Sequence, residues 1–364
     1  MVKLSRNVKN MIIRFRHIFL SALFIIFLYF HRRRDKLTKN KSINQKPQIV
    51  ESKSSTDDFE FLHISNQSIA DLYLPEQTHF YDSQLAIIII SSRTSFKIRN
   101  LIRKTWAKGH KNVFFIVGDS YCDVPNAFRD NNVDCKPAAN FSFVRKDELN
   151  DYVNEQELLT NKLRMEKNVV LVPGLTDTYA NLTKKVKEGI KWVMTRGNPE
   201  WLMKIDEDSM ARIARLENYL ESLKTQQTKE NDLFYIGSMI SNSKVVRNPS
   251  SKWYEWLYKI REWEKAHYPT YANGCCGYIL SNKLVRYIAD NADVLVDYHN
   301  EDSAVGIWLD QSKFRNRIKY IDDAENWLVE QNPGKICDHV NFEQFLVFGH
   351  HLKYKDIKRC YSRM

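Results

Sequence analysis

Three consecutive acids, Asp206, Glu207 and Asp208, stand where an apolar stretch of the chain stops. The stretch, residues 201–205, is typical of a buried strand, and carboxylates at its end repel one another and are costly to desolvate. A hard divalent ion such as Mg²⁺ or Mn²⁺ relieves that cost, since it takes oxygen ligands and leaves positions for substrate phosphates. The triplet therefore predicts a site for a metal-bound phosphate ester. A solvated acidic turn that caps a helix starting near Ala211 is the competing interpretation, of equal weight on spacing alone.

The segments that must position these acids alternate between buried strands and helices. Strands are expected at 85–90, 113–117, 169–172, 201–205 and 234–236. Helices are expected at 99–106, from a cap near Thr176 or Asp177, and from Ala211 to about Leu223. This alternation predicts an α/β fold with a mainly parallel sheet, in which ligands bind at the carboxyl ends of strands. The sequence holds no glycine-rich phosphate loop, so a nucleotide is expected to be held chiefly through metal.

The basic charge of the chain is confined to its N-terminus. The formal net charge is +11, and residues 1–50 supply all of it, with twelve Lys and Arg and the single acid Asp35. The remaining residues hold 43 basic and 43 acidic side chains. A neutral folded part lacks the electrostatic footprint of a nucleic-acid-binding protein, so no nucleic-acid partner is expected.

An uncharged run of 13 residues, Ile18–Phe30, lies between basic flanks. Thirteen helical residues span only about 20 Å of a roughly 30 Å bilayer core, but the preceding arginines can snorkel and extend the helix back to Met11. A cleaved signal peptide is the rival interpretation, but His31 to Arg34 follow in place of a small-residue cleavage site. We therefore expect a cytoplasmic tail at 1–10, a transmembrane signal-anchor at 11–30, a polar stem at 31–83 and a lumenal catalytic domain at 84–364.

Six cysteines form neither zinc-type pairs nor a redox motif; they are Cys122, Cys135, Cys275, Cys276, Cys337 and Cys360. An even number behind a membrane anchor fits a lumenal compartment that permits disulfides. The first two are close enough in sequence to close a local loop, and the pairing of the rest stays open. N-glycosylation sequons at Asn66, Asn140 and Asn181 agree with lumenal placement.

Five sequence blocks occur in a fixed order. They read Arg99-Asn-Leu-Ile-Arg-Lys-Thr-Trp106, Asp177-Thr-Tyr-Ala-Asn-Leu-Thr-Lys-Lys185, Lys204-Ile-Asp-Glu-Asp208, Tyr271-Ala-Asn-Gly-Cys-Cys-Gly-Tyr-Ile-Leu-Ser281 and Glu301-Asp-Ser-Ala-Val-Gly306. Over roughly residues 85–350 they resemble the β-1,3-glycosyltransferase family, which includes β-1,3-galactosyltransferases, β-1,3-N-acetylglucosaminyltransferases, core-1 synthases and Fringe. The first block is closer to the galactosyltransferases and the glycine-rich block is closer to core-1 synthase and Fringe, so the branch stays open.

The resemblance implies a GT-A fold, a UDP-sugar donor and Mn²⁺ as cofactor. By position it implies that Asp208 binds the metal, that Asp206 faces the ribose or uracil of the donor, and that Asp302 is the catalytic base. His350 falls where the family supplies a metal-binding histidine, and His351 is the adjacent alternative. Three further residues are expected to bind the donor: Arg103, Asp177 and Lys204.

Several of these positions also have interpretations that need no ligand. Arg103 could pack on the sheet as part of one helix face, and Asp177 could cap a helix. The glycines of the fourth block are expected to serve backbone conformation rather than to contact a ligand. The aromatic residues of 252–256, with Trp263, are expected to pack in the core in preference to forming a sugar-stacking platform.

The expected function is that of an inverting β-1,3-glycosyltransferase, a type II protein of the Golgi membrane. Galactose is the favoured sugar and N-acetylglucosamine the next. A catalytically lapsed family member acting as a lumenal binding or partner protein is the non-enzyme alternative, and the acids at 206, 208 and 302 favour activity. The expected partners are the UDP-sugar, a glycan acceptor on protein or lipid, and a second copy in a homodimer.

Overall fold

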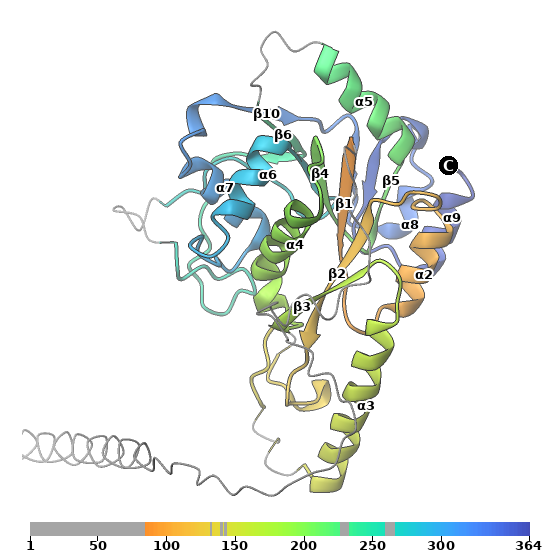
Figure 1. Ribbon diagram of the computed structural model, residues 1–364, viewed down its shortest axis with the longest axis vertical. Coiled ribbons are helices and arrows are strands. Elements are labelled where there is room, and N and C mark those ends of the chain that lie inside the picture. Colours follow the sequence, from red (N-terminus) through yellow and green to blue (C-terminus); the bar gives the residue numbers. More distant parts are fainter. Residues whose placement is uncertain (1–83, 132, 139–140, 142–143, 226–232, 259–265) are drawn as a thin grey trace, which may run out of the picture. The chain divides into compact units, whose positions relative to one another are not determined.

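A seven-stranded sheet forms the centre of the described part of the chain (Figure 1). Its strand order is β10-β6-β9-β4-β1-β2-β3, and β9 alone runs antiparallel to its neighbours. The bounds are β1 Leu85–Ile90, β2 Val113–Ser120, β3 Val169–Thr176, β4 Trp201–Asp206, β6 Leu233–Gly237, β9 Tyr278–Ser281 and β10 Ile318–Asp322. All five expected strands and the mainly parallel sheet are confirmed, whereas β9 and β10 carried no clear signal in the sequence.

The computed structural model describes residues 84–364, apart from 132, 139–140, 142–143, 226–232 and 259–265. All described residues belong to one compact unit of the chain. Within it, no helix combines the length and the apolarity that crossing a bilayer requires. The expected tail, signal-anchor and stem, the sequons at Asn66 and Asn140, and Trp263 lie outside the described residues.

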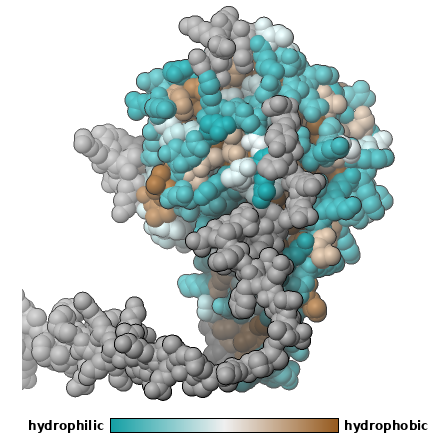
Figure 2. All heavy atoms as spheres, in the orientation of Figure 1, coloured by the Kyte–Doolittle hydropathy of each residue, from teal (hydrophilic) through white to brown (hydrophobic). Residues whose placement is uncertain are grey.

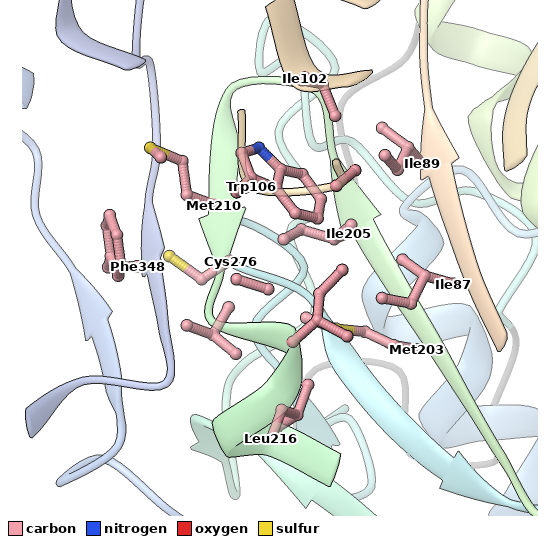
Figure 3. Close-up of a cluster of buried hydrophobic side chains, with 14 of the residues drawn as sticks. Ile87, Ile89, Ile102, Trp106, Met203, Ile205, Met210, Leu216, Cys276 and Phe348 are labelled. Carbon is pink, nitrogen blue, oxygen red and sulfur yellow. The ribbon is translucent and has the colours of Figure 1, made fainter. Parts of the chain in front are cut away.

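Helices cover both faces of the sheet because its strands are buried on both sides. In Figure 1, α4, α6 and α7 lie on one side of the strands, and α2, α5, α8 and α9 lie on the other. Alternate residues of β1 enter two different cores: Ile88 packs with α4 residues such as Ile190, and Ile87 packs with Ile102 and Leu216 (Figure 3). The helix bounds are α2 Phe96–Lys104, α3 Lys146–Arg164, α4 Leu182–Arg196, α5 Ile213–Thr225, α6 Asn282–Asp290, α7 Glu301–Asp310, α8 Pro333–Ile336 and α9 Tyr354–Tyr361.

Two helix starts differ from the sequence interpretation. The residues after the acidic triplet form a short strand, β5 (Ser209–Ala211), and α5 begins only at Ile213, so the acids do not cap that helix. A 3-10 turn, Tyr179–Asn181, precedes α4, and Asp177 does not cap it. Both differences have one cause, because tertiary contacts hold these acids, as described below.

Two small sheets flank the central one. β5 pairs antiparallel with β12 (Val347–Gly349), which also pairs with β11 (Trp327–Val329). β7 (Met239–Ile240) pairs with β8 (Tyr271–Ala272). Short 3-10 helices lie at Asn126–Phe128, Arg315–Arg317 and Phe342–Gln344. The face shown in Figure 2 is mostly hydrophilic over the described residues, as expected for the surface of an independently folded domain.

Four of the six cysteines form disulfides. Cys122 pairs with Cys135 across the expected local loop, and Cys337 pairs with Cys360, which ties α8 to α9. Cys275 and Cys276 are free. Two bridges in one domain fit an oxidising compartment such as the secretory pathway.

The glycine-rich block turns directly against the end of β4. Gly277 has φ +86°, and a Cβ at this position would come 2.1 Å from the carbonyl oxygen of Lys204. Glycine is therefore required twice here, for the left-handed backbone and for the close approach. The expectation that this glycine serves backbone conformation is confirmed.

Replacing Gly277 tests how tightly this turn is built. Gly109 provides a matched control, since it has φ +84° and no atom within 4 Å of a built Cβ. Gly109→Ala should cost about 1–2 kcal/mol from its backbone conformation alone. Gly277→Ala should cost at least about twice as much, because overpacking adds to the same strain. Chemical unfolding of both variants measures the difference, and equal losses would contradict the close packing of this turn.

Candidate active site

The loops after four neighbouring parallel strands open onto one cavity of about 890 Å³. The carboxyl ends of such strands meet at one edge of the sheet, where ligands of α/β proteins bind. Its lining includes Arg93 after β1, Tyr121 after β2, Asp177 and Tyr179 after β3, and Asp206 and Asp208 at the end of β4. A smaller cavity of about 300 Å³ near the C-terminus shares none of these residues.

The three acids at the end of β4 point into different surroundings. Glu207 accepts hydrogen bonds from the hydroxyls of Ser91 and Ser95, the latter at 2.6 Å, so it fastens the β1–α2 loop. Asp206 forms an ion pair with Lys204, and Asp208 faces the loop after β12. The triplet therefore does not act as one cluster of carboxylates, and only its outer members are available to a ligand.

Asp208 lies beside two consecutive histidines. One ligand atom each from Asp208, His350 and His351 fall within 4.8 Å of one another. The backbone N–H of His351 also donates to Asp208 Oδ2 at 2.9 Å. The pairing of Ser209 with Gly349 across β5 and β12 explains this, since the residues just beyond that pair must meet.

The backbone at the two histidines suits the presentation of both rings. His350 has φ 94° and His351 has φ 62°, an uncommon conformation for residues other than glycine. Burial, with the nearby positive groups of His351 and Lys252, lowers the pKa of His350 below its ordinary value. A neutral imidazole is the form that binds metal, so one carboxylate and two imidazoles fit a divalent ion such as Mn²⁺. The structure brings both histidine candidates to Asp208.

A buried lysine joins two acidic segments of the site, the end of strand β4 and the start of helix α7. The Lys204 side chain is 1% exposed, and its ammonium lies 2.9 Å from Asp206 Oδ1 and 2.8 Å from Glu301 Oε2. It also donates to the Gly274 carbonyl at 3.2 Å. Burial alone would lower the Lys204 pKa, but Asp206 and Glu301 outweigh it and raise the pKa above its ordinary value. Lys204 is therefore a charged tie between β4 and α7 and is fully engaged by protein groups.

Asp302 stands in the first turn of α7, next to this tie. It accepts a 2.7 Å hydrogen bond from the Ser303 amide, and Glu301, its neighbour, is held by Lys204 and by the Tyr278 hydroxyl at 2.6 Å. Burial, together with the charge of Glu301, raises the pKa of Asp302 to about 6. Asp302 has no cationic side chain as a direct partner among the described residues, so its carboxylate can accept a proton near neutral pH.

Tyr179 connects Asp302 to the cavity. It lines the cavity, and burial, reinforced by the charges of Asp302, Glu301 and Asp206, raises the pKa of Tyr179 to about 12. Its phenol thus stays protonated and can donate a hydrogen bond. Asp302, expected as the base, and Asp206, expected at the donor, both influence the pKa of Tyr179, so they lie in one region of the site.

Two expected donor residues are engaged elsewhere. Arg103 forms an ion pair with Glu166 at 2.8 Å and donates to the Lys167 carbonyl at 2.6 Å, and it is not part of the cavity lining. The structure thus favours its packing interpretation over diphosphate binding. Asp177 does line the cavity, but its carboxylate pairs with Lys185 and accepts a 2.8 Å hydrogen bond from the Arg93 amide. Its contribution is to position those two cations.

Arg93 and Lys185 are the cations that sequence reasoning missed at the cavity. Arg93 is 5% exposed and its guanidinium donates to the carbonyl of Gln156 and the hydroxyl of Thr160. Lys185 donates to the Ser91 carbonyl at 3.1 Å. The place of Arg93 just after a strand was the available signal, because such loops form the binding edge of an α/β sheet.

The aromatic segment 252–256 is more exposed than expected. Trp253 is 52% exposed and Trp256 is 44% exposed, so the core-packing expectation is wrong for both. The segment is pinned to the residues just before α7: Asn300 donates to the Trp253 carbonyl at 3.0 Å, and His299 contacts the Lys252 carbonyl at 2.7 Å. These two tryptophans therefore lie on a loop fastened beside Asp302.

The sequon at Asn181 lies at the start of α4. Its side-chain amide donates to the Thr176 carbonyl at 2.9 Å, and the residue is only partly exposed. Glycosylation at this position stays a prediction.

Residues 150–319 match the sequence profile of a family described as galactosyltransferase. Beta-1,3-galactosyltransferase 6 of Mus musculus is 31% identical over 155 residues, which cover 43% of this chain and 45% of that protein. Residues 150–319 of the chain are therefore identified as a galactosyltransferase-family segment. The matched segment holds Asp206, Asp208 and Asp302, whereas Arg93, His350 and His351 come from outside it.

Further members of the galactosyltransferase family show the same partial coverage. UDP-GalNAc:beta-1,3-N-acetylgalactosaminyltransferase 2 of Xenopus tropicalis is 30% identical over 43% of this chain and 29% of that protein. Hydroxyproline O-galactosyltransferase GALT5 of Arabidopsis thaliana is 28% identical over 43% of this chain and 21% of that protein. The chain thus matches less than half the length of each of these relatives. Among solved structures, the galactosyltransferase LgtC covers 73% of this chain and 86% of its own, at 11% identity and a TM-score of 0.29, too low to define the fold.

Removing the Lys204 ammonium tests the tie between β4 and α7. Lys204→Met should lower the free energy of unfolding by about 3–5 kcal/mol, because the buried carboxylate of Glu301 and the partly exposed one of Asp206 lose their partner. The double variant Lys204→Met/Glu301→Gln should recover part of that loss, since one of the uncompensated charges is gone. Lys224→Met is the control, because its partly exposed pairs with Glu200 and Glu221 should be worth less than about 1 kcal/mol. Chemical unfolding measures all three, and a Lys204 loss equal to the control would refute the tie.

Proposed function

We propose that this chain is an inverting β-1,3-glycosyltransferase that moves a hexose from a UDP-sugar to a hydroxyl group of a glycan acceptor. The supporting observation is that buried Lys204 pairs with Asp206 and with Glu301, the residue next to Asp302, while Asp208 lines the cavity and lies beside two histidines. The galactosyltransferase-family segment supports the same reaction class. Galactose and N-acetylgalactosamine are the sugars named by the relatives, and we favour galactose.

The cavity side of the site accounts for donor binding in this proposal. Asp206 would meet the ribose or uracil, and Arg93 and Lys185 place cationic side chains in the cavity wall, where they could meet a diphosphate. Asp208, His350 and His351 would hold Mn²⁺, which offsets the negative charge that develops on the departing UDP. The family residues alone do not supply this group, because the histidines lie beyond the matched segment.

Asp302 performs the proton transfer in this proposal. Its carboxylate takes the proton of the acceptor hydroxyl while the hydroxyl oxygen attacks the anomeric carbon and the bond from that carbon to the UDP oxygen breaks. One displacement inverts the anomeric centre, so no enzyme nucleophile is needed. Lys204 holds Glu301 in place, and the charge of Glu301, added to the effect of burial, contributes to the raised pKa of Asp302.

The cellular setting follows from the same assignment. We place the protein in the Golgi membrane as a type II protein with residues 84–364 in the lumen. The two disulfides support passage through the secretory pathway. Anchoring through residues 11–30 and homodimer formation remain predictions.

Asp302→Asn tests the proposed function. It should lower transfer on the order of 10²–10⁴-fold, the range typical for loss of a general base, while UDP and Mn²⁺ binding and the melting temperature stay unchanged. In the unmodified protein, kcat/KM should fall about tenfold per pH unit below about 6, because protonated Asp302 cannot accept a proton. Steady-state assays from pH 4.5 to 8 with UDP-galactose give both results.

Asp310→Asn is the matched control, since Asp310 is the exposed last residue of the same helix. It should leave turnover and its pH dependence unchanged. An Asp302→Asn protein that is destabilised but turns over normally would show a helix-capping role and end this mechanism. An unmodified protein that binds UDP and metal but transfers no sugar to any acceptor would favour the lapsed family member.

The exposed tryptophans give the proposed acceptor a surface to rest on. The Lys252 ammonium lies over the rings of both Trp253 and Tyr179, at 4.8 and 5.6 Å from their centroids, so the loop extends from the cavity lining. The apolar C–H face of a sugar ring packs well against an indole ring, which offers a large contact area. We therefore assign Trp253 to the acceptor side of the site.

Trp253→Ala should raise the acceptor KM about tenfold, the effect of losing about 1.4 kcal/mol of ring contact. The UDP-galactose KM and the slow hydrolysis of UDP-galactose should not change, because neither involves the acceptor. Trp253→Phe should restore most of the affinity. Tyr361→Ala, an aromatic residue 38% exposed on α9, serves as control. Equal effects of Trp253→Ala on donor and acceptor KM would assign the residue to folding of the site instead.

A further inference from the structure

A free thiol lies against the proposed metal ligands. Cys275 Sγ is 3.8 Å from His350 Nε2, and Cys275 takes part in neither disulfide. His350 in turn belongs to the group formed with Asp208 and His351. The described residues thus place a thiol in contact with one imidazole of this group, although the sulfur itself lies outside the set of atoms within 4.8 Å of one another. A thiol is a donor that a hard ion does not need.

The position of this thiol is fixed by the backbone around it. The backbone N–H of Cys275 donates a 3.1 Å hydrogen bond to the side-chain oxygen of Asn273. The Cys275 carbonyl accepts a 2.8 Å hydrogen bond from the hydroxyl of Ser209, the residue next to Asp208. A Cβ at Gly274 would lie 3.1 Å from Glu301 Oε2, so a side chain there would require its neighbours to shift. The turn therefore holds Cys275 beside Asp208.

The distance between sulfur and nitrogen matches shared coordination. Zinc binds thiolate sulfur at about 2.3 Å and imidazole nitrogen at about 2.0 Å, so two such ligands at a tetrahedral angle stand roughly 3.5 Å apart. The observed 3.8 Å requires only a small adjustment. A weak S–H···N hydrogen bond is the alternative explanation of the contact, and it predicts no sulfur ligation.

We propose that Cys275 joins Asp208, His350 and His351 in a four-ligand site for a thiophilic divalent ion such as Zn²⁺. The inference deepens the proposed function. It rests on that function only in taking Mn²⁺ as the ion that competes with Zn²⁺ for the site. Binding displaces the thiol proton to solvent, and the thiolate sulfur then coordinates the ion.

Such a site makes the protein sensitive to the kind of metal present. Thiolate ligands select zinc over manganese, which prefers oxygen donors, and zinc also binds mixed donor sets more tightly in general. A zinc site closed by four protein ligands keeps no open position for a substrate oxygen. Zn²⁺ at this site therefore blocks the diphosphate position that Mn²⁺ leaves open.

The adjacent cysteine offers a matched control. Cys276 is fully buried, its thiol donates to the Leu328 carbonyl at 3.2 Å, and it packs in the core beside Met210 and Phe348 (Figure 3). It is thus a second free thiol, one residue away, whose contacts are with the core. Cys275→Ala and Cys276→Ala remove the same atoms from the two positions.

Co²⁺ is the direct probe, because a cobalt–thiolate bond gives a charge-transfer absorption in the near ultraviolet that nitrogen and oxygen ligands do not give. The full chain, purified in detergent under reducing conditions without UDP, is titrated with Co²⁺, and Zn²⁺ and Mn²⁺ affinities are measured by calorimetry. We expect the band in the unmodified protein and in Cys276→Ala, and its loss in Cys275→Ala. Cys275→Ala should weaken Zn²⁺ binding at least tenfold and leave Mn²⁺ binding unchanged.

Asp208→Asn tests whether the Cys275 thiol belongs to a metal site or lies beside the histidines by chance. It should abolish Mn²⁺ binding and weaken Co²⁺ binding, because a charged oxygen ligand is lost at the same volume. Co²⁺ binding without the charge-transfer band in the unmodified protein, or equal loss of the band in both cysteine variants, would overturn the proposal.

The outcomes for the site and for the proposed function can be told apart. A cobalt–thiolate band in a protein that transfers no sugar with Mn²⁺ supports the site and contradicts the proposed function. Sugar transfer with Mn²⁺ in a protein that shows no band supports the function and contradicts the sulfur ligand. Inhibition by Zn²⁺ that persists undiminished in Cys275→Ala also counts against the sulfur ligand.

Discussion

The site depends on one buried ammonium. Lys204 projects from the central strand β4; its ammonium donates hydrogen bonds to Glu301 and the Gly274 carbonyl and forms an ion pair with Asp206. Without Lys204, Glu301 would be a buried charge without a cation, and breaking such a pair is strongly destabilising. With it, the end of β4, the glycine-rich turn and the start of α7 are locked together. The proposed donor, metal and acceptor sides of the site are parts of those same three elements.

The ion pair between Lys204 and Glu301 gives Glu301 and its neighbour Asp302 different surroundings. Glu301 is satisfied by Lys204 and Tyr278, while Asp302, one residue on, has two backbone amides and no cation among its direct partners. Two adjacent carboxyls thus differ in role because their partners differ: one is structural, and the other has a pKa raised to about 6. Such divergence between neighbouring titratable groups is common where a protein moves protons.

The second constraint is the small sheet beside the main one. Pairing of β12 with β5 carries the chain's C-terminal region back to Asp208 and places two histidines at the end of β4, where His350 contacts the thiol of Cys275. The match to the galactosyltransferase family ends at residue 319, before these histidines. The family segment thus supplies the acids and the tie, and the two histidines arrive through tertiary pairing.

The sequence by itself determined five of the seven strands of the central sheet and pointed to the acids of the candidate site, because apolar runs and short motifs are local signals. It did not reveal that Glu207 accepts a hydrogen bond from Ser91, that Asp177 pairs with Lys185, or that Arg103 pairs with Glu166. These pairs depend on the tertiary fold. The tertiary structure alone decided that Trp253 is exposed, that Lys204 is a tie, and that Cys275 meets His350. Each of these depends on which side chain fills the space beside another, and no local pattern encodes that.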